Sequence, residues 1–256
     1  ALLIFILFIQ PIISELVLEI TKGSDDPYSI AIINFDGPKN TNDQIGSIVN
    51  NDLNRTGEFR ILKDNQLLSS PANQDEINYD DFKLLNVDFI VMGATSQEDK
   101  SNISVAYEIY SVNKKSKIRT STVYGIPNRF RQLSHYISDG IYEEVTGIKG
   151  VASTRLLYVT EQIIDSKSLF KLVVADADGE NEQVLLRSRE PIISPSWSPN
   201  SKEVAYVSFE TGMAKVYIQN IASGSRELVL ENNSQISSPS WSPNGKFLSL
   251  TLYQDG

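Results

Sequence analysis

Cysteine is absent from this 256-residue chain, and histidine occurs once, as His135. Without cysteine the chain has no disulfide framework, no thiolate nucleophile and no zinc site built on Cys ligands. A single imidazole also excludes a metal cluster made of several histidines and leaves little room for a Ser-His-Asp arrangement. We therefore expect no cofactor, no metal site and no enzymatic activity.

Positive charge is also in short supply, since 23 Lys and Arg face 32 Asp and Glu and leave a formal net charge of −9. Such a chain is repelled by phosphate backbones and by anionic lipid headgroups, so no nucleic acid and no direct membrane contact are expected. The sequence contains no G-x-S-x-G elbow, no P-loop and no H-E-x-x-H motif. The 41% of apolar residues is enough for two ordinary domain cores.

A hydrophobic run stands at the start of the chain, where residues 1–9 are apolar and the first charged residue is Glu15. A membrane-spanning helix needs about 20 apolar residues, so this run is too short to cross a bilayer. Its length fits the apolar part of a secretory signal, with Ser14 at the cleavage point. We predict a partial signal peptide over residues 1–14 and hence export; a buried core segment and an uncleaved anchor are the alternatives.

Residues 15–150 alternate between strand and helix patterns and predict a small α/β domain. Strands are expected at 16–21, 28–35, 59–62 and 87–92, and a hairpin at 103–112 and 117–124. Helices are expected at 41–56, 79–85 and 129–146. In the first helix Ile45, Ile48, Val49, Asp52 and Leu53 recur at helical spacing, and in the last helix Leu133, Ile137, Ile141 and Val145 do so.

His135 lies off the apolar stripe of the last helix, and we expect it to be a solvated surface residue. Gly147 directly follows this helix and is expected as its C′ residue.

Residues 151–256 carry an internal repeat. The segment 194–202 recurs as 238–246, an offset of 44 residues with seven consecutive identities. A period of about 40–45 residues with short strands and polar turns is typical of a β-propeller blade. Within the motif Trp197 and Trp241 are expected between neighbouring sheets. Tight turns are expected at the equivalent residues Pro199, Pro243 and Gly245.

The predicted fold class is therefore α+β with two domains, a small α/β N-terminal domain and an incomplete WD40-like β-propeller. Residues 151–256 provide about 2.4 repeats of 44 residues, whereas closed propellers use about 4–8 blades. The segment Asp176–Gly179 has the first residues of a calcium loop, but its repeat partner Asn220–Gly224 has no carboxylate. We expect a hairpin turn there; a cation in the channel of a closed propeller stays open.

The repeats, read as Pro-x-Trp-Ser-Pro-Asn-Gly followed by apolar strands, resemble the blades of the TolB family and of propeller-bearing serine peptidases. The region before them favours TolB, through Ser138-Asp139 and the junction residues 146–150 and 154–159. The resemblance implies a six-bladed propeller in a monomeric, non-enzymatic periplasmic protein of the Tol–Pal system. That system maintains outer-membrane integrity and constriction during cell division. The alternative is the N-terminal propeller portion of a serine peptidase.

The resemblance also implies two protein partners. TolA would bind the start of the mature chain, at Glu15, Leu16, Val17, Leu18, Glu19, Ile20, Thr21 and Lys22. The alternating apolar residues of this segment suit strand addition to a partner sheet, although an edge strand of its own domain is the alternative. The lipoprotein Pal would bind loops entering the Ser-Pro-Ser-Trp strands, at Glu190, Pro191, Ile192, Gln235, Ile236 and Ser237.

Overall fold

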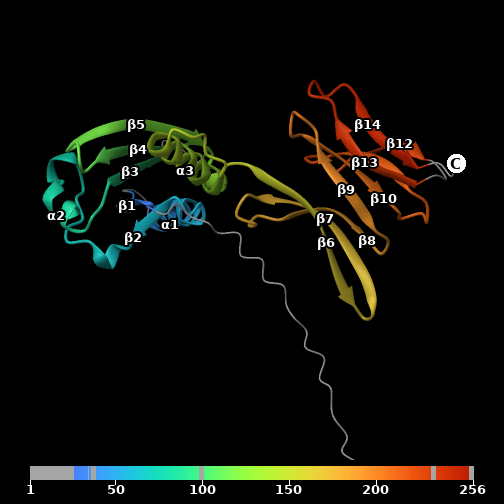
Figure 1. Ribbon diagram of the computed structural model, residues 1–256, viewed down its shortest axis with the longest axis horizontal. Coiled ribbons are helices and arrows are strands. Elements are labelled where there is room, and N and C mark those ends of the chain that lie inside the picture. The colour runs from blue at the N-terminus through green and yellow to red at the C-terminus, as the bar shows by residue number, and fades with distance from the viewer. Residues whose placement is uncertain (1–25, 34, 36–38, 98–100, 232–234, 254–256) are drawn as a thin grey trace, which may run out of the picture.

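The structure is a computed structural model that describes residues 26–33, 35, 39–97, 101–231 and 235–253 (Figure 1). The expected signal peptide 1–14, the expected strand 16–21 and the expected TolA segment 15–22 lie outside these residues. Among the helices that are described, none is both long and apolar enough to cross a membrane.

The first half of the chain forms one five-stranded sheet in the order β2-β1-β3-β4-β5. Its strands are β1 (Tyr28–Ile32), β2 (Phe59–Leu62), β3 (Phe89–Gln97), β4 (Ile103–Ser111) and β5 (Ser116–Gly125). β1 runs parallel to both β2 and β3, and β3, β4 and β5 form an antiparallel meander. Parallel neighbours need a crossover connection, which α1 (Lys39–Arg55) supplies between β1 and β2.

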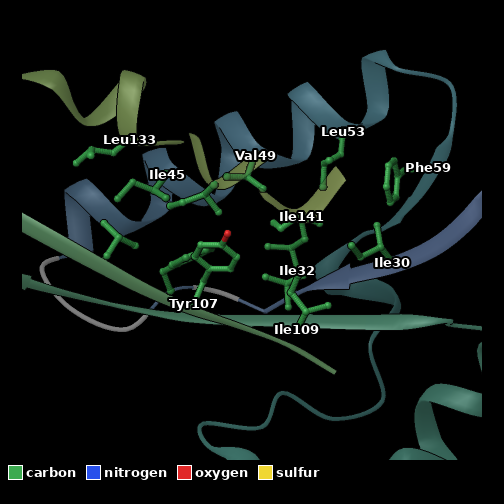
Figure 2. Packing of buried hydrophobic residues seen from close by; sticks show 14 of the residues in the cluster. Ile30, Ile32, Ile45, Val49, Leu53, Phe59, Tyr107, Ile109, Leu133 and Ile141 are labelled. Atoms are coloured by element: carbon green, nitrogen blue, oxygen red, sulfur yellow. The ribbon is translucent and has the colours of Figure 1, made fainter. Parts of the chain in front are cut away.

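Helices cover both faces of this sheet. α1 and α3 (Phe130–Thr146) pack on one face, and α2 (Tyr79–Leu84) packs on the other. Single turns of 3-10 helix occur at η1 (Asp64–Gln66), η2 (Gln74–Glu76) and η3 (Pro127–Arg129). Figure 2 shows apolar side chains of α1 and α3 meeting those of the sheet, among them Ile30, Ile32, Ile45, Val49, Leu53, Tyr107, Ile109, Leu133 and Ile141.

The apolar stripe predicted for α3 is confirmed, because Leu133, Ile137 and Ile141 are all buried in this core. The predicted C′ residue is confirmed too. Gly147 has φ +74°, and its N–H donates to the Glu143 carbonyl at 2.9 Å.

Two strands differ from their predicted bounds. The sequence predicts a strand over residues 28–35, whereas β1 ends at Ile32. The larger difference is in β3. The sequence predicts residues 87–92, whereas β3 begins at Phe89 and continues to Gln97. Its second half pairs with the start of β4, with Gly93 opposite Tyr107 and Gln97 opposite Ile103. Residues 93–97 are weakly apolar, so the sequence pattern does not predict a strand there. The extension depends on pairing with β4.

The second half of the chain forms three antiparallel sheets. The first contains β6 (Arg155–Ile164), β7 (Lys167–Asp176) and β8 (Gln183–Ser188). The second, in the order β12-β11-β10-β9, contains β9 (Ile192–Trp197), β10 (Glu203–Ser208), β11 (Lys215–Asn220) and β12 (Arg226–Glu231). The third pairs β13 (Gln235–Trp241) with β14 (Leu248–Tyr253).

The sheets follow one another as successive blades (Figure 1). Leu172 of the first sheet packs with Val204 and Tyr206 of the second, and Val216 of the second packs with Ile236 of the third. The predicted fold class is confirmed: a mixed α/β domain precedes a propeller-type region that does not close a ring within the described residues. The predicted domain boundary at residue 150 stays a prediction.

The repeated motif builds the same turn in two sheets. Asn200 Oδ1 accepts hydrogen bonds from the Ser198 hydroxyl and the Lys202 N–H, both at 2.8 Å. The Ser198 hydroxyl oxygen accepts from the Glu203 N–H at 3.0 Å. Residues 242–247 repeat all three hydrogen bonds. The identities in the repeat therefore reflect a shared turn geometry.

Trp197 lies in the cluster between the first and second sheets, and the Arg155 guanidinium stands 4.8 Å from its ring centroid. Trp241 is half-buried at the end of β13.

The segments expected as Pal-binding loops are partly strands, which is a correction. β9 begins at Ile192 and β13 begins at Gln235, so only Glu190 and Pro191 of the six residues precede a strand. Ile192 and Ile236 are 3% and 2% exposed, because each packs between neighbouring sheets. The apolar residues at these strand starts, Ile192 and Ile193 in β9 and Ile236 in β13, belong to the sheets and not to loops.

Candidate functional site

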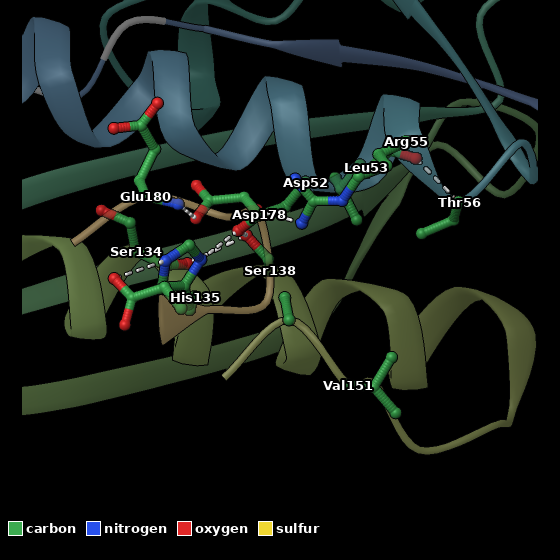
Figure 3. Close-up of polar contacts among 12 residues, drawn as sticks. Asp52, Leu53, Arg55, Thr56, Ser134, His135, Ser138, Val151, Asp178 and Glu180 are labelled. Carbon is green, nitrogen blue, oxygen red and sulfur yellow. Dashed lines mark hydrogen bonds and ion pairs between the residues drawn. The ribbon is translucent and has the colours of Figure 1, made fainter. Parts of the chain in front are cut away.

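A partly buried polar cluster lies where α1, α3 and the turn between β7 and β8 meet (Figure 3). We call it the interdomain cluster, and its members are Asp52, Arg55, Arg131, His135, Ser138, Asp176 and Asp178. It joins the α/β domain to the first propeller sheet through side chains from three separate segments.

The position of His135 corrects the sequence prediction. His135 is 2% exposed instead of solvated. The apolar stripe of α3 packs on the sheet, while the His135 side of the helix faces α1 and the β7–β8 turn. α3 is therefore buried on two sides. A single apolar stripe in the sequence predicts only the side that packs on the sheet, and not the contact of His135 with α1 and the turn.

His135 is held mainly by Asp52 of α1, which is itself 2% exposed. The imidazole Nδ1 lies 2.7 Å from Asp52 Oδ2. The Ser138 hydroxyl donates to the same oxygen at 2.8 Å. Arg55 Nη2 pairs with Asp52 Oδ1 at 3.0 Å, so both carboxylate oxygens have partners.

The β7–β8 turn supplies two more carboxylates. Asp176 Oδ2 lies 3.7 Å from His135 Nε2, and Arg131 pairs with Asp176 at 3.4 Å and with Asp178. The Gly179 N–H donates to the Asp176 carbonyl at 2.9 Å and closes the turn. The predicted hairpin turn is confirmed, and its carboxylates face α3.

The charges of the cluster raise the pKa of His135. Burial is the largest single effect and would lower it, but the hydrogen bond and charge of Asp52, together with the charges of Asp178 and Asp176, outweigh burial. Burial likewise would raise the pKa of the Asp178 carboxyl, which the Glu180 N–H and the Arg131 guanidinium instead hold below its ordinary value. The arrangement therefore favours a protonated imidazole among ionised carboxylates.

The same residues include a possible metal-ligand set. Ligand atoms of Asp52, His135 and Asp178 lie within 4.8 Å of one another. Arg55 already pairs with Asp52 and Arg131 with Asp178, so permanent cations take part of the negative charge that a divalent ion would need. This chemistry suits a proton better than a metal ion.

Two hollows flank the interdomain cluster. One has a volume of about 310 Å³ and is lined by residues of α1 and α3 together with Val151 and Leu156. The other has a volume of about 970 Å³, and its lining residues include Arg129, His135, Arg155 and Trp197. Both lie along the boundary between the domains, so a change at the cluster changes their walls.

The connection between the domains is tied to α3. The two Asp139 carboxylate oxygens accept hydrogen bonds from the Ala152 N–H at 2.6 Å and the Ser153 N–H at 3.1 Å. Gly150 lies so close to Asp139 that a Cβ would clash with its backbone. The linker therefore follows a path fixed by one carboxylate and one missing side chain.

The residues predicted to bind partners lie elsewhere. Glu190 and Pro191 are exposed between β8 and β9, and Ser237 is half-buried in β13. None of the described ones belongs to the interdomain cluster. The sequence does not predict the cluster, because His135 and Asp52 are 83 residues apart. The Asp-x-Asp of the turn was the signal that could have pointed to a cationic partner.

The chain is similar to two family models, which together cover most of it. The TolB amino-terminal domain matches residues 16–118, and the TolB beta propeller domain matches residues 142–256. The chain belongs to the TolB family. The "Tol-Pal system protein TolB" of Alcanivorax borkumensis is 39% identical over 244 residues, which are 95% of this chain and 56% of that protein. The TolB of a Marinomonas species is 38% identical over 224 residues, 86% of this chain and 52% of that protein.

Structural similarity agrees with the sequence match. The crystal structure of TolB from Acinetobacter baumannii superposes with a TM-score of 0.82 at 33% identity, covering 91% of this chain and 57% of that one. The chain thus spans about half the length of the TolB relatives it matches.

Proposed function

We propose that this chain serves the Tol–Pal system as a non-enzymatic, monomeric interaction protein of the periplasm, exported by the signal of residues 1–14. The supporting observation is the match to both TolB domains, in the same chain order, at 39% identity to a protein named for that system. In this role it contributes to outer-membrane integrity and to constriction during cell division.

Pal is the proposed partner of the propeller region. Among the candidate residues, Glu190 and Pro191 are exposed and available for contact. Ile192 and Ile236 are buried, so they would act by holding β9 and β13 in place. TolA is the proposed partner of residues 15–22, whose alternating apolar side chains suit an added strand.

Calorimetric titration with the soluble domain of Pal tests the proposal, with full-length TolB of Alcanivorax borkumensis as a positive control. The chain is titrated as it stands and after deletion of residues 15–26. We expect binding that persists without the segment, and a separate titration in which TolA binds only when the segment is present. Failure to bind either partner, while the control binds both, would reject the proposal.

A charge reversal refines the Pal surface. Glu190→Lys places a new cation at the exposed turn, and we expect it to change the Pal affinity several-fold, mainly through electrostatic complementarity. Glu227→Lys is the matched control, because Glu227 is exposed on β12, away from the candidate turn. If the two variants bind Pal with equal affinity, Glu190 is not part of the Pal-binding surface.

A further inference from the structure

The interdomain cluster contains the one histidine of the chain at the place where the two domains meet. Its two ring nitrogens face different domains. Nδ1 lies 2.7 Å from Asp52 of α1, and Nε2 lies 3.7 Å from Asp176 at the end of β7. Nε2 is buried and has no hydrogen-bond partner among the described residues.

We propose that His135 is a proton-operated latch between the domains: protonated, it holds the β7–β8 turn against α1 and α3, and its deprotonation releases that turn. The latch goes beyond the proposed function, and it stands or fails independently of Pal and TolA.

Charge balance across the three packed segments supports the latch. α1 contributes Asp52 and Arg55, and α3 contributes Arg131 beside His135. The β7–β8 turn contributes Asp176 and Asp178. With His135 protonated, three cations meet three carboxylates. Loss of its proton leaves one negative charge in excess within a partly desolvated site, which is costly.

Deprotonation also changes the contact with the propeller side. A neutral imidazole that keeps its Nδ1 proton for Asp52 presents the Nε2 lone pair to Asp176. The attraction between the protonated Nε2 and Asp176 Oδ2, which are 3.7 Å apart, is then lost, because both atoms are now hydrogen-bond acceptors. Arg131 still holds the turn, so we expect looser domain packing and no separation of the chain into independent parts.

The sign follows from the raised pKa of His135. The latch is fully closed below the ordinary histidine pKa of about 6.5. It opens as pH rises through the higher pKa of the folded chain.

A distance measurement between the domains tests the latch. The chain has no cysteine, so spin labels can be placed at Asn113→Cys and Thr211→Cys, two exposed turn positions in different domains. We expect a narrow distance distribution at pH 6 and a broader one at pH 9, in the presence of a chelator. His135→Gln should show the same distribution at both pH values.

Nuclear magnetic resonance of the single imidazole provides the second readout. Asp178→Asn removes one carboxylate from the turn and should lower the midpoint of the His135 titration. Asp165→Asn alters an exposed turn carboxylate between β6 and β7 and should leave the midpoint unchanged. This readout does not depend on whether His135→Gln folds.

Three outcomes would overturn the latch. A distance distribution that does not respond to pH, while His135 titrates, would make the cluster a static contact. A pH response that survives in His135→Gln would place the switch on another group. A response that appears only with added zinc and vanishes with the chelator would assign Asp52, His135 and Asp178 to a metal.

Discussion

At the scale of single residues, α3 is adapted to close neighbours on each side. Gly140 faces the buried Tyr107 of β4, and a Cβ at Gly140 would overlap the Tyr107 hydroxyl. The ring is enclosed in the core and cannot move away without disturbing its neighbours. A small residue here allows helix and sheet to approach closely.

Gly140→Ala is therefore expected to destabilise the chain by about 1–3 kcal/mol, because overpacking outweighs the gain in helix propensity. Urea unfolding followed by circular dichroism measures the change.

Gly46→Ala is the matched control. Gly46 lies in α1, and apart from its chain neighbours and its own helix backbone no heavy atom of the described residues lies within 4 Å of the place that an alanine methyl group would occupy. Alanine should therefore stabilise the helix by up to about 1 kcal/mol. If both substitutions raise the free energy of unfolding, helix propensity, and not the Tyr107 contact, governs position 140.

His135 gives the chain a pH-dependent stability of its own. Since the pKa of His135 is raised in the folded state, its contribution is complete below about pH 6.5 and disappears as pH rises through the folded pKa. We expect the urea midpoint of the unaltered chain to fall across that window. The midpoint of His135→Gln should stay flat there; a parallel fall in both chains would contradict the assignment.

At the scale of the elements, the two copies of the repeated turn differ at one position. Gly245 has φ +68° in the second copy, and Ser201 has φ +57° at the equivalent place in the first. Left-handed backbone costs a non-glycine residue about 1 kcal/mol or more. The first turn is therefore built with a strain that the second avoids.

Ser201→Gly should stabilise the chain by about 0.5–1 kcal/mol, the relief of strain exceeding the entropy that glycine adds to the unfolded state. The Ser201 carbonyl, which accepts from Arg155 at 2.7 Å, is kept. Thermal unfolding by calorimetry measures the shift.

Gly245→Ser is the reciprocal control and should be destabilising by a similar amount. Space is available for its side chain, since Pro199 lies 3.8 Å from the Cβ position. A neutral result for both variants would mean that the turn relaxes around either residue.

The elements also show what the sequence could and could not predict. The stripe of α3 was visible because Leu133, Ile137 and Ile141 recur at helical spacing, and the blade period was visible because its turns reuse the same hydrogen bonds. In contrast, Ser194 and Ser238 have φ +52° and +55° at bulges before Pro195 and Pro239. No glycine marks these positions, so a local reading could not find them.

The interdomain cluster was hidden for a different reason. His135 pairs with Asp52, 83 residues away, and with a turn that belongs to another sheet. Hydrophobic periodicity predicts single helices and strands. It does not predict that α1 and the β7–β8 turn pack against the same side of α3.

At the scale of the whole molecule, the two domains are coupled through the linker as well as through the interdomain cluster. Asp139→Ala removes the acceptor of the Ala152 and Ser153 N–H groups. We expect the variant to lose about 1–3 kcal/mol and to unfold in two separated calorimetric transitions.

Glu143→Ala is the control for this prediction, because Glu143 is an exposed residue of the same helix. It should unfold like the unaltered chain. Two transitions in all three proteins would mean that the linker does not couple the domains.

The order of strands in the first sheet also has a consequence for the time course of folding. β1 is inserted between β2 and β3, so its pairing of Ile30 with Phe89 spans 59 residues of chain, whereas β3, β4 and β5 pair with their immediate neighbours. Local hairpins form within microseconds, and distant pairings wait for loop closure. The meander should therefore be the nucleus, and β1, although it precedes the other described strands in the chain, should be among the last to be immobilised.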